Sequence, residues 1–184
     1  MTAPKAIGAI ELSSIGLGYQ VQDEMLKAAN VEILIARTIC SGKYLIVVAG
    51  EVAPVKAAVE AGRATARNHL TDHSVIPHVH WQVLPAIRAV TEVEDLRALG
   101  IIETFGLPSC IVAADAAVKA AAIELIEVRL ARALGGKAFT VFTGEVAAVR
   151  SAVKAGEREV RDTGLLLGSV VIPQPHTDLL RTIL

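Results

Sequence analysis

Four histidines lie within a short stretch of the sequence, and imidazole is a common ligand for several transition metals. They are His69, His73, His78 and His80. His78 and His80 alternate along the end of an expected strand, and no cysteine or carboxylate beside them completes an obvious ligand set. The spacing therefore keeps a metal-binding hypothesis open but does not by itself define a metal site.

The sequence also shows few candidate residues for covalent or acid–base catalysis. The sequence contains no Gly-x-Ser-x-Gly, Gly-x-Gly-x-x-Gly or P-loop pattern. Glu11 and Glu103 end two expected strands, but carboxylates repeated at equivalent positions are more typical of a structural role. A catalytic nucleophile or base also needs a positioned partner, and none stands out. We therefore expect no enzyme activity and no bound cofactor.

The composition limits the partners of the chain. The 184 residues are 53% hydrophobic and 20% charged, with a formal net charge of −1, so the positive surface of a nucleic-acid binder is absent. The longest apolar stretches are far shorter than the roughly 20 residues of a membrane-spanning helix, and we see no secretory signal. We therefore expect no nucleic-acid or membrane partner. So many apolar residues indicate an additional buried interface.

A tandem duplication organises the whole sequence. Gly8-Ala9-Ile10-Glu11 returns as Gly100-Ile101-Ile102-Glu103, and Gly50-Glu51-Val52-Ala53 returns as Gly144-Glu145-Val146-Ala147. Further pairs of blocks follow in the same order. A repeat of this length is the signature of two copies of one structural unit. We place the two domains at residues 1–90 and 98–184.

Each copy is expected to alternate strands with helices, which gives an α/β (α+β) fold with helices on one face of a sheet. In the first copy we expect strands at 6–12, 31–39, 43–49 and 75–77, with helices at 20–30, 51–69 and 81–88. In the second copy we expect strands at 100–103, 123–131, 137–143 and 169–172, with helices at 114–122, 145–162 and 177–183.

The order of these blocks resembles the shell domain of bacterial microcompartments. The resemblance rests on the run from Cys40 to Gly62, its repeat from Leu134 to Gly156, and the Val-Ile-Pro-x-x-His endings at His80 and His176. Among tandem members, the T-type shell proteins of propanediol-utilisation compartments are the most similar in order and length. The resemblance implies two ferredoxin-like domains per chain and a homotrimer that imitates a hexameric ring. It also implies a location in the microcompartment shell, within the cytoplasm.

In such a ring the turn between the two central strands of each copy lines a central pore. The matching residues are Cys40, Ser41 and Gly42 in the first copy and Leu134, Gly135 and Gly136 in the second. Lys43 and Lys137 follow the turns, so we expect a pore that favours small polar or anionic metabolites. Small residues suit a crowded axis, but glycine is also ordinary hairpin chemistry, and both lysines could simply begin a strand.

The resemblance further implies contacts with other shell proteins at the tile edges. The edge and corner positions are Lys27, Asn30, Lys119, His78, His80, Gln174 and His176. The two copies differ at these positions, because Asn30 becomes Ala122 and the two endings differ before their shared histidine. We therefore expect the two kinds of edge to be inequivalent.

The two cysteines leave one question open. T-type members carry an iron–sulfur cluster at the pore, and clusters need thiolate ligands. The turn around Leu134 has no cysteine, so we expect no cluster there. Cys40 in the first turn leaves open a metal or iron–sulfur centre for electron transfer. The histidine cluster leaves open a second alternative, a metal-binding regulatory trimer. Cys110 precedes an apolar run and is expected in the core.

Overall fold

A computed structural model describes residues 4–93, 95–131, 134–180 and 183. The chain divides into two compact units. The first unit contains the chain up to Val79 together with Gly106–Ser109 and Ala131–Lys137, and the second contains the remainder. Short segments of the second sequence repeat thus belong to the first unit. No helix in the described part of the chain is long and apolar enough to cross a membrane.

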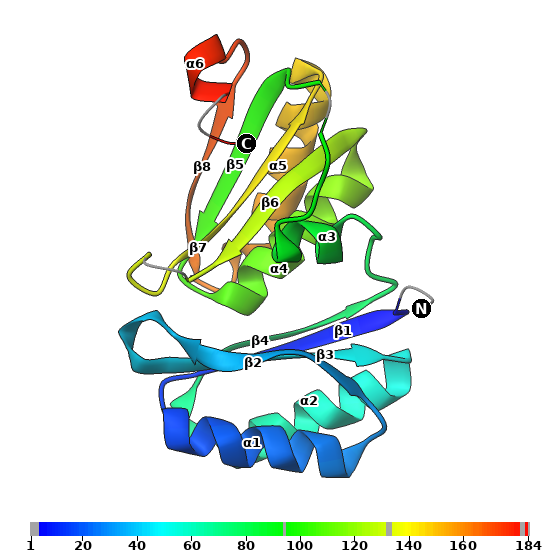
Figure 1. Ribbon diagram of the computed structural model, residues 1–184, viewed down its shortest axis with the longest axis vertical. Helices are drawn as coiled ribbons and strands as arrows, with labels where there is room; N and C mark the ends of the chain where they lie inside the picture. Colours follow the sequence, from blue (N-terminus) through cyan, green and yellow to red (C-terminus); the bar gives the residue numbers. More distant parts are fainter. Residues whose placement is uncertain (1–3, 94, 132–133, 181–182, 184) are drawn as a thin grey trace. The chain divides into compact units, whose positions relative to one another are not determined.

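The first repeat forms a four-stranded sheet in the order β2-β3-β1-β4, with every neighbouring pair antiparallel. Two main helices cover one face of this sheet, as Figure 1 shows. The strands are β1 (Ala6–Leu12), β2 (Glu32–Ile39), β3 (Lys43–Gly50) and β4 (Leu70–Pro77); the helices are α1 (Ile15–Ala28), α2 (Val52–Ala66) and α3 (Val83–Arg88), with 3-10 turns η1 (Cys40–Gly42) and η2 (Arg67–His69).

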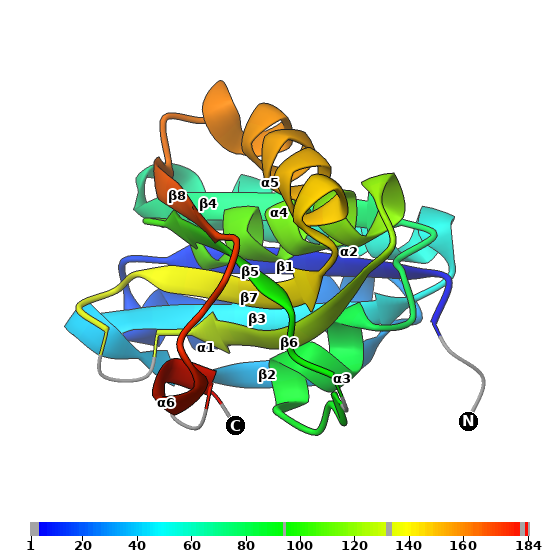
Figure 2. The same cartoon turned by 90° about the horizontal axis from the view of Figure 1, so that it is seen from above.

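The second repeat has the same topology, with strand order β6-β7-β5-β8 and antiparallel pairing throughout. Figure 2 shows α4 and α5 on the same side of that sheet. The strands are β5 (Ala98–Thr104), β6 (Ile123–Leu130), β7 (Ala138–Gly144) and β8 (Leu166–Ile172); the helices are α4 (Leu107–Ala120), α5 (Val146–Arg161) and α6 (Thr177–Leu180).

The register of the strands aligns the two repeats residue by residue. Glu11 is paired with Asp72 across β1 and β4, and Glu103 is paired with Gly168 across β5 and β8. Both sheets carry a register shift directly after this glutamate. Glu11 and Glu103 hold equivalent register positions in the two sheets. Because the side chains of a strand alternate between its two faces, both glutamates therefore lie on the equivalent face of their sheets.

Glycine allows the helices to pack closely in both repeats. A Cβ on Gly62 in α2 would lie 2.5 Å from Ile10 Cδ1 and 2.8 Å from Met25 Cγ. Its equivalent in α5, Gly156, would meet Ile102 Cδ1 at 2.5 Å and the backbone oxygen of Ala113 at 2.8 Å. A larger residue would force the packed layers apart, so the spacing of helix and sheet depends on these two positions.

Several expected boundaries were wrong. α1 begins at Ile15 rather than at residue 20, because the Ser14 side chain accepts a hydrogen bond from the Leu17 N–H at 3.4 Å and caps the helix. The two glycines in its first turn hide this start from sequence patterns. α4 likewise begins at Leu107, and β4 extends back to Leu70.

Candidate functional site

The first candidate pore turn is the single 3-10 turn η1 between β2 and β3. Ser41 and Gly42 both adopt left-handed backbone conformations, with φ of 66° and 71°. Glycine tolerates this region freely, whereas serine is strained there. The Cys40 thiol donates a hydrogen bond to the backbone oxygen of Ala131 at 3.0 Å. This bond ties the turn to the segment that leads into the second candidate turn.

The second candidate turn is also tight and lies beside the first, within the same compact unit. Gly135 and Gly136 have φ of 61° and 86°, and the Lys137 N–H donates to the Leu134 oxygen at 3.2 Å. A Cβ built on Gly136 would lie 3.4 Å from Ser41 Oγ and 3.9 Å from Lys43 Nζ. The two turns that the sequence analysis selected are therefore neighbours in space.

Lys43 begins β3, and its ammonium forms an ion pair. Its ammonium donates to Glu11 Oε1 at 2.7 Å. The other Glu11 oxygen accepts the backbone N–H of Leu107 at 2.8 Å. Burial raises the pKa of Glu11, opposed by its hydrogen bonds to Lys43 and Leu107. The carboxylate thus neutralises Lys43 and caps a helix start at the same time.

Asp72, the cross-strand partner of Glu11, caps the start of the same helix. Its carboxylate accepts the backbone N–H of Ser109 at 2.7 Å and that of His73 at 2.7 Å. Burial raises the pKa of Asp72. Asp72 and Glu11 together satisfy two of the N–H groups that the first turn of a helix leaves unbonded. The two carboxylates fix the start of α4 within the first unit.

The lysines assigned to tile edges occupy the last turns of equivalent helices. Lys27 donates to Asp23 at 2.5 Å, and Lys119 donates to Asp115 at 2.5 Å. The hydrogen bond to Asp23 raises the pKa of Lys27. Asn30 is exposed after α1. Both lysines are exposed, and their role at a tile edge stays a prediction.

The corner residues do not form a strand end, which corrects the sequence expectation. β4 ends at Pro77, and His78 follows in a left-handed conformation with φ of 51°. His80 donates its backbone N–H to Asp115 Oδ1 at 2.8 Å, and its ring lies 5.7 Å from that of Trp81. In the second repeat Gln174 and His176 are exposed.

The metal hypotheses gain no geometric support from the described residues, among which no three His, Cys, Asp or Glu side chains gather into a ligand cluster. The four histidines are dispersed: His69 lies in η2, His73 in β4, and His78 and His80 beyond it. Cys110 is buried in α4, and burial raises its pKa to about 12. Cys40 is partly exposed.

Sequence reasoning missed the buried carboxylates that accept distant backbone N–H groups. Glu11 was identified only as a repeated structural carboxylate, and Asp72 and Asp115 were not singled out. A signal was present: Ser14 caps α1, whereas its equivalent before α4 is Gly106, which has no side chain to do so. A helix start without its own cap requires an acceptor from elsewhere in the fold.

The fold and its paired turns define a class of protein: a duplicated α/β domain whose two repeats supply equivalent turns and helices. Residues 6–79 and 98–175 both match the BMC domain, so this chain belongs to the family of bacterial microcompartment shell proteins, with two tandem domains. The resemblance inferred from the sequence is confirmed, and so is the fold class of two tandem α/β domains.

Curated relatives and a solved structure support the assignment. The microcompartment shell protein PduT of Citrobacter freundii is 42% identical over 177 residues, covering 96% of each chain. The carboxysome assembly protein CcmO of Synechococcus elongatus is 32% identical, over 95% of this chain and 67% of its own. A microcompartment protein structure from Desulfitobacterium hafniense has a TM-score of 0.85 and 45% identity, covering 97% of this chain and 99% of that one.

Proposed function

We propose that the chain forms a homotrimeric tile of a microcompartment shell, with a central pore for small polar metabolites. Members of this family reside in the shell, inside the bacterial cytoplasm. Three chains with two domains each would imitate a ring of six, since head-to-tail contacts that close give cyclic assemblies. The proposed role is structural, and the domain boundaries 1–90 and 98–184 remain part of the proposal.

The observation that carries the pore is the approach of the two turns. A Cβ on Gly136 would lie 3.4 Å from Ser41 Oγ, so the two turns are adjacent and could line the same opening. In a trimer, copies of this pair would surround the axis. The lining would comprise Cys40, Ser41, Gly42, Leu134, Gly135 and Gly136, flanked by Lys43 and Lys137.

The charge of the proposed lining is weaker than the two lysines alone would imply. Glu11 offsets Lys43 at 2.7 Å. Exposed backbone N–H groups in left-handed turns still offer hydrogen bonds to anions. We therefore expect a modest preference for anionic over cationic metabolites, set by the turns as much as by the lysines.

The pore is tested at Ser41, because both aspartate and asparagine tolerate its left-handed backbone. Ser41→Asp places a carboxylate at the lining, and Ser41→Asn is the uncharged control of similar shape. Flux of a small carboxylate through reconstituted sheets should fall in the aspartate variant far more than in the asparagine variant. Equal flux in both would remove these turns from the conducting path.

The oligomeric state is tested by light scattering. A particle of roughly three times 19.3 kDa is expected. A stable monomer or dimer at micromolar concentration would contradict the trimer. The proposed partners are other shell proteins, which would meet the tile at Lys27, Asn30, Lys119, His78, His80, Gln174 and His176.

A second candidate role is electron transfer through a centre held by Cys40. The observation in its favour is the position of this partly exposed thiol in η1, where a trimer would bring three copies near the axis. Three thiolates are one fewer than the four that common iron–sulfur clusters use, so the fit is partial. Visible absorbance after anaerobic purification that disappears in Cys40→Ser would establish this role.

A further inference from the structure

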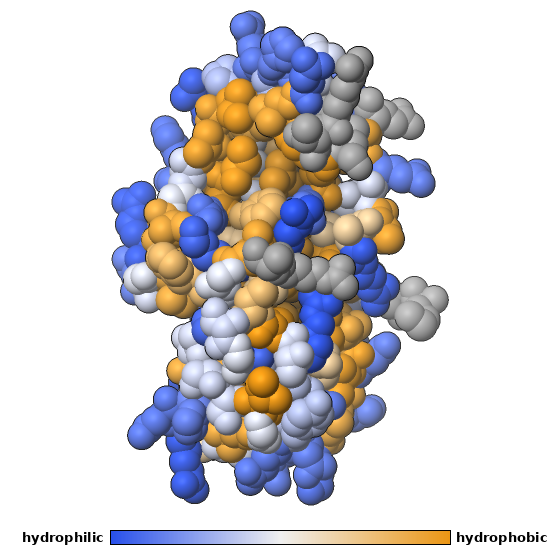
Figure 3. Space-filling model, turned by 60° about the vertical axis from the view of Figure 1, so that its left-hand side comes forward, coloured by the Kyte–Doolittle hydropathy of each residue, from blue (hydrophilic) through white to orange (hydrophobic). Residues whose placement is uncertain are grey.

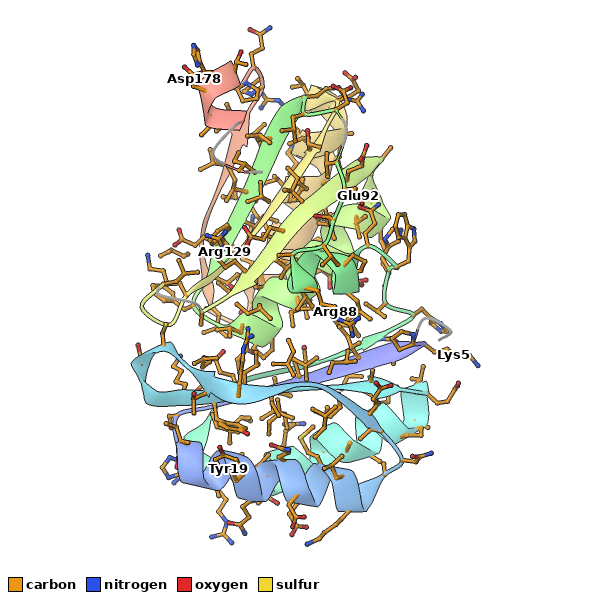
Figure 4. The ribbon with its side chains drawn as sticks, viewed as in Figure 1. Lys5, Tyr19, Arg88, Glu92, Arg129 and Asp178 are labelled. Carbon is orange, nitrogen blue, oxygen red and sulfur yellow. The ribbon has the colours of Figure 1, made fainter. Side chains whose placement is uncertain are left out.

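A hollow of about 560 Å³ lies in the first repeat between α2 and β4, the last strand of its sheet. In Figure 4, Tyr19 marks α1, and α2 lies beside it against the same face of the sheet. Figure 3 shows hydrophilic side chains gathered over this helical side of the first repeat. The volume lies within the range of small-molecule sites, so the α2–β4 hollow is large enough for a small metabolite.

Basic side chains line much of this hollow. Lys56 and Arg63 come from α2, where a spacing of two helical turns places both on one side of the helix. His73 comes from β4, and Ser74 beside it adds a hydroxyl donor. Two permanent cations, an imidazole and a hydroxyl are donors that suit an anion.

The floor of the hollow is apolar. Val59 on α2 is 2% exposed, and Val75 on β4 packs against the same hydrophobic core. Because β4 is an edge strand, its outer side can also offer backbone N–H groups to a ligand. A ligand that fits would therefore combine a charged group with a short carbon chain.

Glu60 supplies a carboxylate to the same lining and accepts a hydrogen bond from Arg63 Nη1 at 2.9 Å. The side chains of this pair are 72% and 42% exposed, and exposed ion pairs contribute little to stability. A guanidinium has five N–H donors in all. Arg63 can therefore bind an anion without giving up its bond to Glu60.

The charges around His73 respond to one another. Partial burial lowers the pKa of His73, and the positive charge of Arg63 lowers it further, whereas Asp72 and Glu60 act in the opposite direction. The Asp72 carboxylate accepts the backbone N–H groups of His73 and Ser109. An anion between His73 and Arg63 would favour the imidazolium, because opposite charges stabilise each other.

The second repeat has different groups at the equivalent place. Glu157 on α5 corresponds to Arg63, and Ser169 on β8 corresponds to His73. The Ser169 hydroxyl donates to the Glu157 carboxylate, which also forms an ion pair with Arg161. There a carboxylate and a hydroxyl satisfy each other. In the first repeat both are replaced by groups that carry positive charge and repel, which an anion between them would offset.

We propose that the α2–β4 hollow binds a small phosphate monoester, with its phosphate held by Lys56, Arg63 and the protonated imidazole of His73. The carbon chain of the ester lies against Val59 and Val75. A phosphate is favoured over a carboxylate because it carries a charge of about −1.5 to −2 and three acceptor oxygens. The site uses α2 and β4 alone, so it depends on neither the proposed pore nor the proposed trimer.

The imidazole of His73 reports on the hollow directly. NMR titration of the histidine ring signals, assigned with His73→Gln, follows the full chain with and without glycerol 3-phosphate at constant ionic strength. The ligand should raise the pKa of His73, whereas the ring signals of His69, which lies outside the hollow, should not respond. A His73 titration that saturating ligand leaves unchanged would overturn the proposal.

Variants separate the hollow from the general charge of the chain. Arg63→Gln should weaken binding of glycerol 3-phosphate about tenfold by calorimetry, since hydrogen bonds between charged groups are the strong ones. Lys56→Gln should also weaken binding, whereas Lys154→Gln, on exposed α5 of the other repeat, should not. Equal effects of the two lysine variants would show non-specific attraction and overturn the site.

A series of ligands tests the chemical class. Glycerol 3-phosphate should bind more tightly than inorganic phosphate, by roughly fourfold for each CH₂ group that the floor covers. Equal affinities would overturn the ester, and equally tight binding of propionate would overturn the phosphate. Sulfate keeps its double charge over the whole pH range used. Its affinity should increase as pH falls through the pKa of His73 and should be independent of pH in His73→Gln; the same pH dependence in both would remove His73 from the site.

Discussion

Glu11 and Lys43 form an ion pair in which the Glu11 side chain is completely buried and the Lys43 side chain is 20% exposed, with 2.7 Å between Oε1 and Nζ. A buried carboxylate is costly unless it is paired and hydrogen-bonded. Here the partners are an ammonium and the start of α4. The pair thus links the residue after the proposed pore turn to the start of α4. Its contribution to the stability of the protein can be tested by mutation.

Lys43→Met should destabilise the protein at pH 7 by about 3 kcal/mol, because it leaves the buried Glu11 charge without its counterion. Burial already raises the pKa of Glu11, so the native state binds this proton more tightly than the unfolded state. Stability from this group therefore increases as pH falls through the folded pKa towards 4.5. The penalty in Lys43→Met should shrink over that window, as measured by urea unfolding.

Two further variants control this result. Glu11→Gln combined with Lys43→Met removes both charges and should recover much of the lost stability at pH 7. Lys154→Met removes an exposed lysine and should change stability by less than about 0.5 kcal/mol. A penalty in Lys43→Met that is independent of pH would show that Glu11 is not the affected group.

Gly62→Ala should destabilise by about 1–3 kcal/mol, because the new Cβ would overlap Ile10 and Met25 in a packed layer. Gly156→Ala should cost more, since one of its contacts is the backbone oxygen of Ala113, which cannot rotate away. Gly16→Ala is the matched control: nothing lies within 4 Å, and alanine should stabilise α1 by about 0.5–1 kcal/mol. Thermal unfolding ranks the three variants.

Replacing both edge lysines by glutamine should leave the trimer intact and abolish assembly into sheets. Both side chains of the Lys27–Asp23 pair are exposed, and exposed ion pairs contribute little to the free energy of folding. Lys27→Arg with Lys119→Arg keeps the charges and should still tile. Electron microscopy of sheets, beside light scattering of the trimer, distinguishes an edge role from a solvated helix end.

Cys110 should resist thiol reagents in the folded protein. Its pKa is raised to about 12, so only about one part in 10⁴ is thiolate at pH 8. In Cys40→Ser, reaction with a disulfide reagent should begin only once denaturant is added. Rapid reaction without denaturant would mean that α4 opens readily.

The duplication, the shell-domain family and the positions of the paired turns were predictable from the sequence. Repeated blocks such as Gly50-Glu51-Val52-Ala53 preserve chain order, and left-handed turns require glycine, so both signals survive in one dimension. The assignment of Cys110 to the core was also predictable, because it begins an apolar run. The pore and edge roles of the matched residues remain predictions.

The tertiary structure alone decided which groups neutralise and cap one another. Nothing in the sequence separates Glu11, which is buried against Lys43 and Leu107, from an exposed carboxylate, because its partners lie 32 and 96 residues away. The same holds for Asp72 with Ser109 and for Asp115 with His80. A sequence pattern records the local conformation of a segment, whereas a hydrogen-bond partner depends on where folding brings a distant backbone N–H.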